Sequence, residues 1–305
     1  METLVEPSVL VQLSEDLANA VERAGQGVVT VHARRRMPAS GIIWSDDGLI
    51  VTANHVVERD DEITVSLPDG READATLLGR DGGSDLALLQ IKATEITAAP
   101  RSETPARIGH LVLAVGRPGE SGPMASHGVV SAVGGPWRTG QGTSVDGFIQ
   151  ADVAMLPGFS GGPLVDARGG VLGLNSSTLG RGSGLTIPNV AIDHIVASLR
   201  AHGKVRRGYI GISTQTVRLA PAMAKTAGTD REQGLIIHSV EPDSPAERAG
   251  LFLGDVIVAL DGEPISRVEE LQERLSGDRV GRTLPVRVIR AGAPLELQIT
   301  VGERG

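Results

Sequence analysis

Short apolar segments separated by glycine- and proline-containing turns run through most of this sequence. Leu49–Thr52 follows the turn Ser45–Gly48, and Glu62–Leu67 is joined to Glu72–Leu78 across Pro68–Gly70. The 305 residues include 40 glycines and 17 prolines, and we find no repeat period. Because such segments are short and often interrupted, they predict a mainly β fold, a sandwich or a barrel, and not a helical bundle.

A change in sequence texture near residue 205 divides the chain. Before it lie the expected strands, preceded by a helix over residues 8–24, in which leucine or valine recurs every three or four positions. After it, Ser244–Glu247 and Ser266–Glu269 match the capping-box pattern that opens helices. We therefore expect an N-terminal helical segment at 1–24, a β domain at 25–205 and a smaller α+β domain at 206–303.

Composition excludes several classes of function. The chain has no cysteine, which rules out disulfides, cysteine-ligated zinc and a thiol nucleophile. Its formal charge of −8 lacks the basic surplus that nucleic-acid binding requires. Its seven histidines are scattered and form no His-Glu-x-x-His pattern, so neither a metal nor a cofactor is predicted.

The N-terminus and the hydropathy bear on the compartment. No stretch approaches the ~18 consecutive apolar residues of a membrane span, so none is predicted. Met1–Leu13 carries Glu2 and Glu6 where a secretion signal would carry lysine or arginine. As written, the sequence predicts a cytoplasmic protein. If the N-terminus is incomplete, the alternative location is the cell envelope.

The segment Gly158–Gly162, with the sequence Gly-Phe-Ser-Gly-Gly, carries the strongest catalytic signal. Glycines on both sides of Ser160 permit a tight turn that exposes the hydroxyl and aims backbone N–H groups at one point. Such an arrangement forms an oxyanion hole for acyl transfer. A glycine turn with an ordinary surface serine would look the same, so the segment alone does not decide.

A serine nucleophile also needs a base and a carboxylate that orients the base. His55 follows the apolar run Leu49–Ala53, and Asp85 immediately precedes another, Leu86–Leu89. Taken alone, His55 would more often be structural, and Asp85 a strand or turn cap. The order His, Asp, Ser argues against the α/β-hydrolase elbow, in which the serine comes first and a helix follows it.

Over residues 25–303 the chain resembles the HtrA (Deg) serine proteases, in which a chymotrypsin-like protease domain precedes a PDZ domain. Thr52–Val57 is similar to the family's histidine motif, Asp85–Leu89 to its aspartate motif and Gly158–Leu164 to its serine motif. The segments that resemble the walls of the family's specificity pocket are Gly173–Ser176 and Gly184–Pro188.

The resemblance implies two six-stranded barrels and definite roles in peptide hydrolysis. Ser160 would attack the peptide carbonyl, His55 would take and return the proton, and Asp85 would orient the imidazole. The oxyanion hole would be formed by the backbone of Gly158, Phe159 and Ser160. The substrate pocket, which would favour a small or medium aliphatic residue, would be lined by Leu185, Thr186 and Ile187.

In the second domain, Gly208–Ile212 resembles the PDZ loop that binds a terminal carboxylate. Glycine-flanked N–H groups would hold the carboxylate while the peptide adds as a strand to a sheet edge. The residues of this predicted peptide site are Tyr209, Ile210, Gly211 and Ile212. The implied partners are unfolded polypeptide substrates and peptide C-termini.

Two departures from the family pattern bear on the site and on the assembly. Phe159 stands where the family commonly has asparagine. The family also implies a homotrimer built on aromatic residues near the N-terminus, and this chain has no aromatic residue before Trp44.

The predicted function is a serine endopeptidase that cleaves unfolded or damaged proteins. The alternative is a latent-protease chaperone or PDZ scaffold that binds such proteins without cleaving them. Turnover of an unfolded substrate distinguishes the two.

Overall fold

The computed structural model describes residues 8–119, 121–139, 144–180, 184–206, 208–275 and 279–303. Residues 1–7 of the predicted N-terminal segment lie outside the described residues. By its internal contacts the chain divides into two compact units, residues 1–205 and 206–305. Each unit is described by itself.

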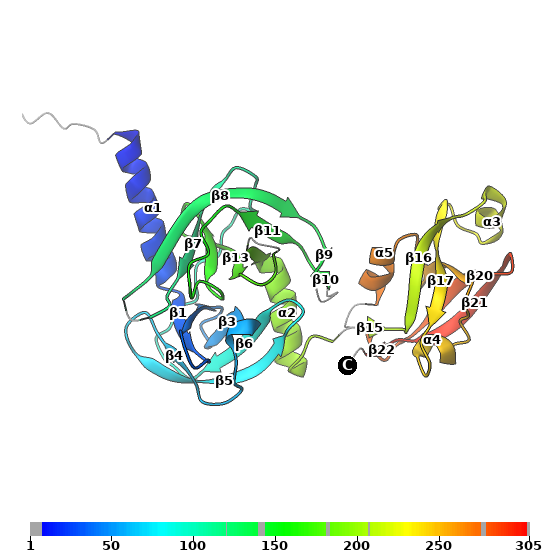
Figure 1. Ribbon diagram of the computed structural model, residues 1–305, viewed down its shortest axis with the longest axis horizontal. Helices are drawn as coiled ribbons and strands as arrows, with labels where there is room; N and C mark the ends of the chain where they lie inside the picture. The colour runs from blue at the N-terminus through cyan, green and yellow to red at the C-terminus, as the bar shows by residue number, and fades with distance from the viewer. Residues whose placement is uncertain are drawn as a thin grey trace, which may run out of the picture. The chain divides into compact units, whose positions relative to one another are not determined.

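The first unit is mainly β (Figure 1). Its elements, in chain order, are α1 (Val9–Gly25), β1 (Val28–His32), β2 (Ala39–Ile43), β3 (Leu49–Ala53), the 3-10 turn η1 (Asn54–Val56), β4 (Ile63–Ser66), β5 (Glu72–Asp81), β6 (Leu86–Ile91), β7 (Leu111–Gly116), β8 (Met124–Gly134), β9 (Trp137–Arg138), β10 (Ser144–Val145), β11 (Phe148–Ala151), β12 (Pro163–Asp166), β13 (Val171–Ser176), β14 (Leu185–Pro188) and α2 (Asn189–His202).

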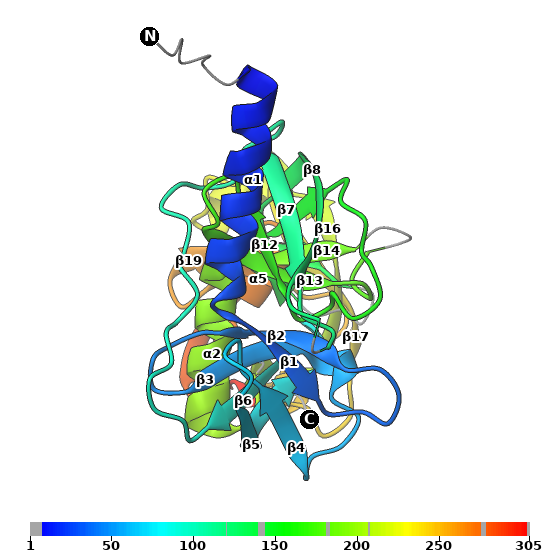
Figure 2. The same ribbon diagram turned by 90° about the vertical axis from the view of Figure 1, so that its left-hand side faces the viewer.

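Most of these strands close into two barrels, which are seen from two sides in Figures 1 and 2. The strand order is β1-β2-β3-β6-β5-β4 in the first barrel and β11-β14-β13-β12-β7-β8 in the second. Every residue of β3 is buried, and its apolar side chains belong to a core cluster that draws on both barrels and both helices. The prediction of a double six-stranded barrel is confirmed.

Helix α1 is capped by Ser8, whose side chain accepts a hydrogen bond from the N–H of Val11. Its C-terminal half packs on the barrels through Ala20 and Ala24, which are buried. Its N-terminal half extends past them (Figure 2), and Leu10 is 77% exposed there. Within the described ranges, no helix combines the length and the apolar character needed to cross a membrane.

The second unit is an α+β domain. Its elements are β15 (Gly208–Tyr209), β16 (Ile212–Arg218), α3 (Pro221–Thr226), β17 (Gln233–Val240), α4 (Pro245–Arg248), β18 (Val256–Leu260), β19 (Glu263–Pro264), α5 (Val268–Arg274), β20 (Thr283–Arg290), β21 (Ala293–Thr300) and β22 (Gly302–Glu303). The main sheet has the order β16-β17-β18-β20-β21, which leaves β16 at an edge, and α5 lies against β16.

An ion pair between a buried carboxylate and a half-buried arginine links the start of β18 to β20 in this sheet. Asp255 is 1% exposed and accepts two hydrogen bonds from the guanidinium of Arg290, at 2.7 and 2.8 Å, and one from the N–H of Phe252. Burial opposes ionisation of the Asp255 carboxyl, but these hydrogen bonds outweigh burial and hold its pKa below the usual value. The pair therefore stabilises the folded second unit at neutral pH.

We expect Asp255→Asn to lower the local stability of this unit by about 2 kcal/mol at pH 7, the order found for charged, buried hydrogen bonds. Because the folded pKa is depressed, the contribution is complete above about pH 4, the unfolded value, and is lost as the pH falls through the folded pKa. The difference between variant and wild type should therefore shrink at pH 3. Hydrogen exchange of β18 and β20 along a urea series measures this difference in local free energy of unfolding.

Glu232→Gln is the matched control in the same unit. Glu232 pairs with Arg218 across 3.4 Å, but both side chains are about four-fifths exposed, at 78% and 82%. Such exposed pairs contribute less than about 1 kcal/mol. An equal loss in both variants, or a loss in Asp255→Asn that persists unchanged at pH 3, would contradict the role given to the Asp255 carboxylate.

Candidate active site

The pairing of β3 with β6 places His55 beside Asp85. Ala53, the last residue of β3, is opposite Leu86, the first residue of β6. The turn η1 follows β3 directly and carries His55, while Asp85 precedes β6 with a left-handed φ of 56°. The N–H of Asn54 donates to the carbonyl oxygen of Asp85 at 3.0 Å. The two predicted residues are thus held together by the backbone of the first barrel.

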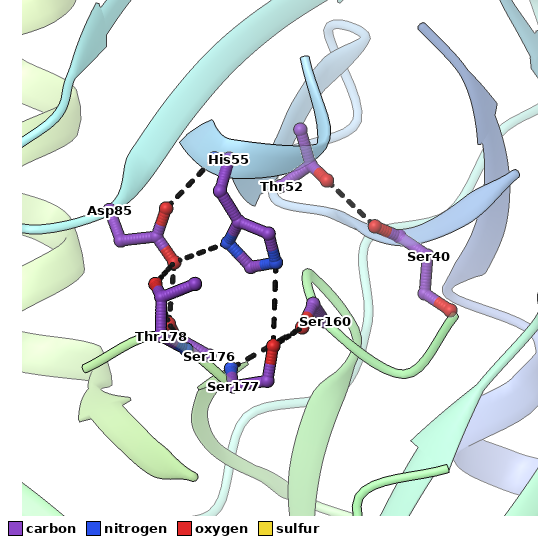
Figure 3. Close-up of polar contacts among 8 residues, drawn as sticks. All are labelled: Ser40, Thr52, His55, Asp85, Ser160, Ser176, Ser177 and Thr178. Carbon is purple, nitrogen blue, oxygen red and sulfur yellow. Dashed lines mark hydrogen bonds and ion pairs between the residues drawn. The ribbon is translucent and has the colours of Figure 1, made fainter. Parts of the chain in front are cut away.

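The Asp85 carboxylate binds His55 twice and is otherwise surrounded by hydroxyls (Figure 3). Oδ1 accepts from the His55 N–H at 2.9 Å, and Oδ2 lies 2.7 Å from His55 Nδ1. Oδ2 also accepts from the hydroxyls of Ser176 and, at 2.9 Å, Thr178. Burial opposes ionisation of Asp85, but the hydrogen bonds with His55 and Ser176 outweigh it and keep the pKa of Asp85 below the usual value. The carboxylate is therefore ionised at neutral pH.

Ser160 lies in the turn that precedes β12, in the second barrel. Gly161 in this turn has a φ of 87°, and a Cβ there would lie 2.1 Å from the carbonyl oxygen of Ser40, so only glycine fits. Ser40 on β2 fixes the same turn from the first barrel: its hydroxyl donates to the carbonyl oxygen of Gly158 at 2.7 Å, and its N–H donates to that of Ser160 at 3.3 Å. Contacts between the barrels thus position the predicted nucleophile.

The oxyanion hole is predicted to use the backbone N–H groups of Gly158 and Ser160, with Phe159 between them. The N–H of Phe159 donates to the carbonyl oxygen of Leu156 at 3.1 Å, so it does not face a substrate. The N–H groups of Gly158 and Ser160 donate to no other described residue. The Phe159 side chain is 0% exposed and packs in the core of the second barrel. Phenylalanine at this position therefore serves the core, and the N–H groups of Gly158 and Ser160 stay available within the described part of the chain.

Ser177 stands between Ser160 and His55 (Figure 3). The Ser160 hydroxyl donates to Ser177 Oγ at 2.9 Å, and Ser177 Oγ lies 3.5 Å from His55 Nε2. Among the described side chains, no direct hydrogen bond joins Ser160 to His55. The structure thus gathers His55, Asp85 and Ser160 in one place, with a fourth residue inserted between the serine and the histidine.

The predicted pocket residues lie on β14, but they do not share one environment. Leu185 is half-buried and is opposite Ser176 of β13. Thr186 is buried and donates to Asn175 Oδ1 at 2.7 Å. Ile187 is 1% exposed and belongs to the core cluster shared with the helices. Of the three, Leu185 alone keeps substantial exposure beside the site.

The predicted PDZ loop forms a tight turn at the edge of the second unit's main sheet. Ile210 is buried in the core, and Gly211 has a φ of 78°. A Cβ on Gly211 would lie 2.2 Å from Ser244 Cβ, so glycine is required there. The hydroxyl of Tyr209 donates to the carboxylate of Glu241. The N–H groups of Ile210 and Gly211 donate to nothing in the described part of the chain, and Ile212 begins the edge strand β16.

Sequence reasoning missed four residues of the site: Ser40, Ser176 (in its role as a partner of Asp85), Ser177 and Thr178. The run Ser176–Thr178, three hydroxyl residues at the end of an apolar segment, was the available signal. Such runs are common in loops, so the pattern alone identifies no partner. Within the described residues, acidic and histidine side chains form no group of three that could hold a metal ion.

Comparisons with known proteins agree with the two units. Residues 39–174 match the family model of the trypsin-like peptidase domain, and residues 208–301 match that of the PDZ domain. The serine endoprotease DegS of Escherichia coli (strain K12) is 35% identical over 306 residues, covering 93% of this chain and 85% of DegS. A solved structure of the HtrA-type protease AlgW with a decapeptide has a TM-score of 0.79 and 31% identity, covering 95% of this chain and 99% of that one.

A DegP-like protein of Ectopseudomonas mendocina, described as a probable periplasmic serine endoprotease, is 38% identical over 269 residues. These residues cover 86% of this chain but 56% of the relative, so the chain spans little more than half of its length. The predicted cytoplasmic location is contradicted by such periplasmic relatives. That prediction relied on the lack of a secretion signal in the first residues, and this lack identifies no compartment.

The similarity to DegS is by itself sufficient to assign the family, because it covers most of both chains. It agrees with the two barrels, with the PDZ unit and with the proximity of His55, Asp85 and Ser160. The chain belongs to the HtrA (Deg) family of serine endoproteases, with a trypsin-like peptidase domain followed by a PDZ domain.

Proposed function

We propose that Ser160, His55 and Asp85 hydrolyse peptide bonds in unfolded or damaged proteins. The observation that carries the proposal is the 2.7 Å contact between Asp85 Oδ2 and His55 Nδ1. This contact requires the proton on Nδ1 and leaves the Nε2 lone pair to face the side of the site where Ser160 lies. A neutral histidine held in this tautomer can accept the proton of the serine as it attacks.

The reaction then follows acyl-transfer chemistry. Ser160 Oγ adds to the peptide carbonyl, and the free N–H groups of Gly158 and Ser160 stabilise the developing oxyanion. The protonated His55 gives its proton to the leaving amine, and water then hydrolyses the acyl-enzyme by the same steps. Asp85 stabilises the imidazolium through its negative charge. For this attack the serine must turn from Ser177 to His55.

The substrate side chain at the cleaved bond is proposed to lie against Leu185, with Thr186 and Ile187 supporting the wall from within the core. A half-buried leucine at the pocket wall favours a small or medium aliphatic residue. Relatives described as DegS and DegP-like serine endoproteases support proteolysis as the activity. Those described as periplasmic support a location in the cell envelope for this chain.

Digestion of unfolded casein by the wild-type protein tests the function. Cleavage, together with covalent labelling of Ser160 by a fluorophosphonate located by peptide mass spectrometry, would support the proposed nucleophile. Labelling at another serine would contradict the assignment. Binding of casein with neither cleavage nor labelling would favour the chaperone alternative. The homotrimer implied by the resemblance stays a prediction, which sedimentation velocity can check.

We also propose that the second unit binds peptide C-termini. The N–H groups of Ile210 and Gly211 would hold the terminal carboxylate, and the peptide would add as a strand beside β16, with α5 on its other side. The related protease AlgW, solved with a decapeptide, supports peptide binding in this family. The Glu241 carboxylate accepts a hydrogen bond from the Tyr209 hydroxyl, and this hydrogen bond partly offsets the negative charge of Glu241.

A peptide that ends in a hydrophobic residue should bind at least about tenfold more weakly when its C-terminus is amidated, because a charge-assisted hydrogen bond is lost. Gly211→Ala should abolish binding of the free-acid peptide, since its Cβ would enter the space of Ser244. Gly262→Ala is the matched control, with a φ of 80° but open space around its Cβ. Fluorescence anisotropy measures the affinity of both peptides for wild type and of the free-acid peptide for the two variants. Equal affinity of wild type for acid and amide would refute carboxylate recognition.

A further inference from the structure

Three consecutive hydroxyl residues, Ser176 to Thr178, begin at the last residue of β13 and contact both ends of the candidate triad. The outer two donate to Asp85 Oδ2. The middle one, Ser177, turns the other way and contacts Ser160 and His55 (Figure 3). Because Asp85 is 3% exposed and fixed by His55, it anchors the residues on both sides of Ser177. The place of Ser177 is therefore set by its neighbours and not by its own side chain alone.

Ser177 engages both the proton and a lone pair of the Ser160 hydroxyl. A serine hydroxyl has one proton to donate, and Ser160 gives it to Ser177 Oγ at 2.9 Å. The N–H of Ser177 in turn donates to Ser160 Oγ at 3.3 Å. Nucleophilic attack needs the same proton to pass to His55 Nε2. In this arrangement the Ser160 hydroxyl is therefore directed away from its base.

The position of Ser177 relative to solvent fits a restraining role. Ser160 is 7% exposed, whereas Ser177 is exposed. A substrate carbonyl must reach Ser160 from the solvent side, so an entering peptide meets Ser177 first. The contact between Ser177 Oγ and His55 Nε2, at 3.5 Å, is at the limit of a hydrogen bond. A contact of this length transfers a proton poorly. Ser177 therefore acts less as a relay from Ser160 to His55 than as an acceptor that competes with His55 for the Ser160 proton.

We propose that Ser177 is a positioning residue that holds Ser160 in a resting orientation until an entering substrate displaces Ser177. The inference rests on the proposed role of Ser160 as the nucleophile. Only the fraction of molecules in which Ser160 has left Ser177 is competent, and the apparent affinity for substrate is reduced by that fraction. Removal of the Ser177 hydroxyl raises the competent fraction without touching the groups that react.

The test compares the full-length wild type with Ser177→Ala, Ser177→Thr and Ser131→Ala. Ser177→Ala should label with a fluorophosphonate about fivefold faster, the size of one lost neutral hydrogen bond. With fluorescent casein its KM should fall by a similar factor while kcat stays unchanged. Ser177→Thr keeps a hydroxyl and should stay within about twofold of wild type on the same reasoning. Ser131 on β8 is exposed, and its hydroxyl takes part in no hydrogen bond with another described residue, so its alanine variant should match wild type.

The outcomes separate the inference from the function on which it rests. Equal labelling rates and equal KM values for wild type and Ser177→Ala would overturn the restraint while leaving the serine protease in place. A lower kcat in Ser177→Ala would also overturn it, because it would make Ser177 a proton relay. If neither wild type nor Ser177→Ala reacted with the probe or cleaved casein, the proposed nucleophile itself would fail, and the inference with it.

Discussion

Ser160→Ala should lower the turnover of unfolded casein by about 10⁴-fold or more, the loss that follows removal of the nucleophile from a serine protease triad. The substitution deletes the Oγ that would form the acyl-enzyme, so the remaining N–H groups and His55 can act only on water. Quantitative gel or fluorescence assays of casein over several days give enough range to measure such a loss.

The same variant should fold as the wild type does. The turn around Ser160 is fixed by backbone groups and by Ser40, and Ser160→Ala keeps all of these contacts. Among the described residues, the lost hydroxyl forms hydrogen bonds with Ser177 alone, so thermal unfolding should shift little. Cleavage by Ser160→Ala at more than about a hundredth of the wild-type rate, against the much larger loss expected on removing a nucleophile, would remove Ser160 from its proposed role.

The sequence predicted the parts of the site that strand order determines. His55 and Asp85 each adjoin an apolar segment, and the pairing of these segments as β3 and β6 brings the two residues together. The first helix was predicted over residues 8–24, and α1 runs from Val9 to Gly25 with Ser8 as its cap. Local patterns that follow from backbone chemistry, such as caps and apolar periodicity, carry this information in the sequence.

The remaining features depend on where side chains point, and the sequence does not encode this locally. Phe159 was noted as a departure beside the nucleophile, but whether it faced the substrate or the core could not be read from the sequence; it fills the core of the second barrel. The second capping box was predicted with Glu269, whereas Glu270 accepts the hydrogen bonds from the N–H groups of Ser266 and Arg267. The interposition of Ser177 arises from two neighbours that bind Asp85, which is distant in sequence.

Asp85→Asn should reduce kcat on casein by about 10⁴-fold at neutral pH, because it imposes the wrong tautomer on the base. An asparagine amide placed at Oδ2 would donate to His55 Nδ1, and the imidazole proton would then sit on Nε2. The Ser176 and Thr178 hydroxyls can rotate to accept from the amide, so the fold should persist. The opposite placement would set the amide against the His55 N–H, donor against donor, and is disfavoured.

The control for this variant is Asp193→Asn on α2. Asp193 also pairs with a cation, Arg101 at 2.8 Å, but its side chain is 44% exposed and lies outside the candidate site. Its loss should leave kcat unchanged, since exposed pairs contribute less than about 1 kcal/mol to stability and nothing to the tautomer of His55. If Asp85→Asn kept more than about a tenth of the wild-type kcat while labelling at Ser160 also persisted, the tautomer argument would fail. His55 would then act as a base without the orienting carboxylate, and the 2.7 Å contact would be a structural one.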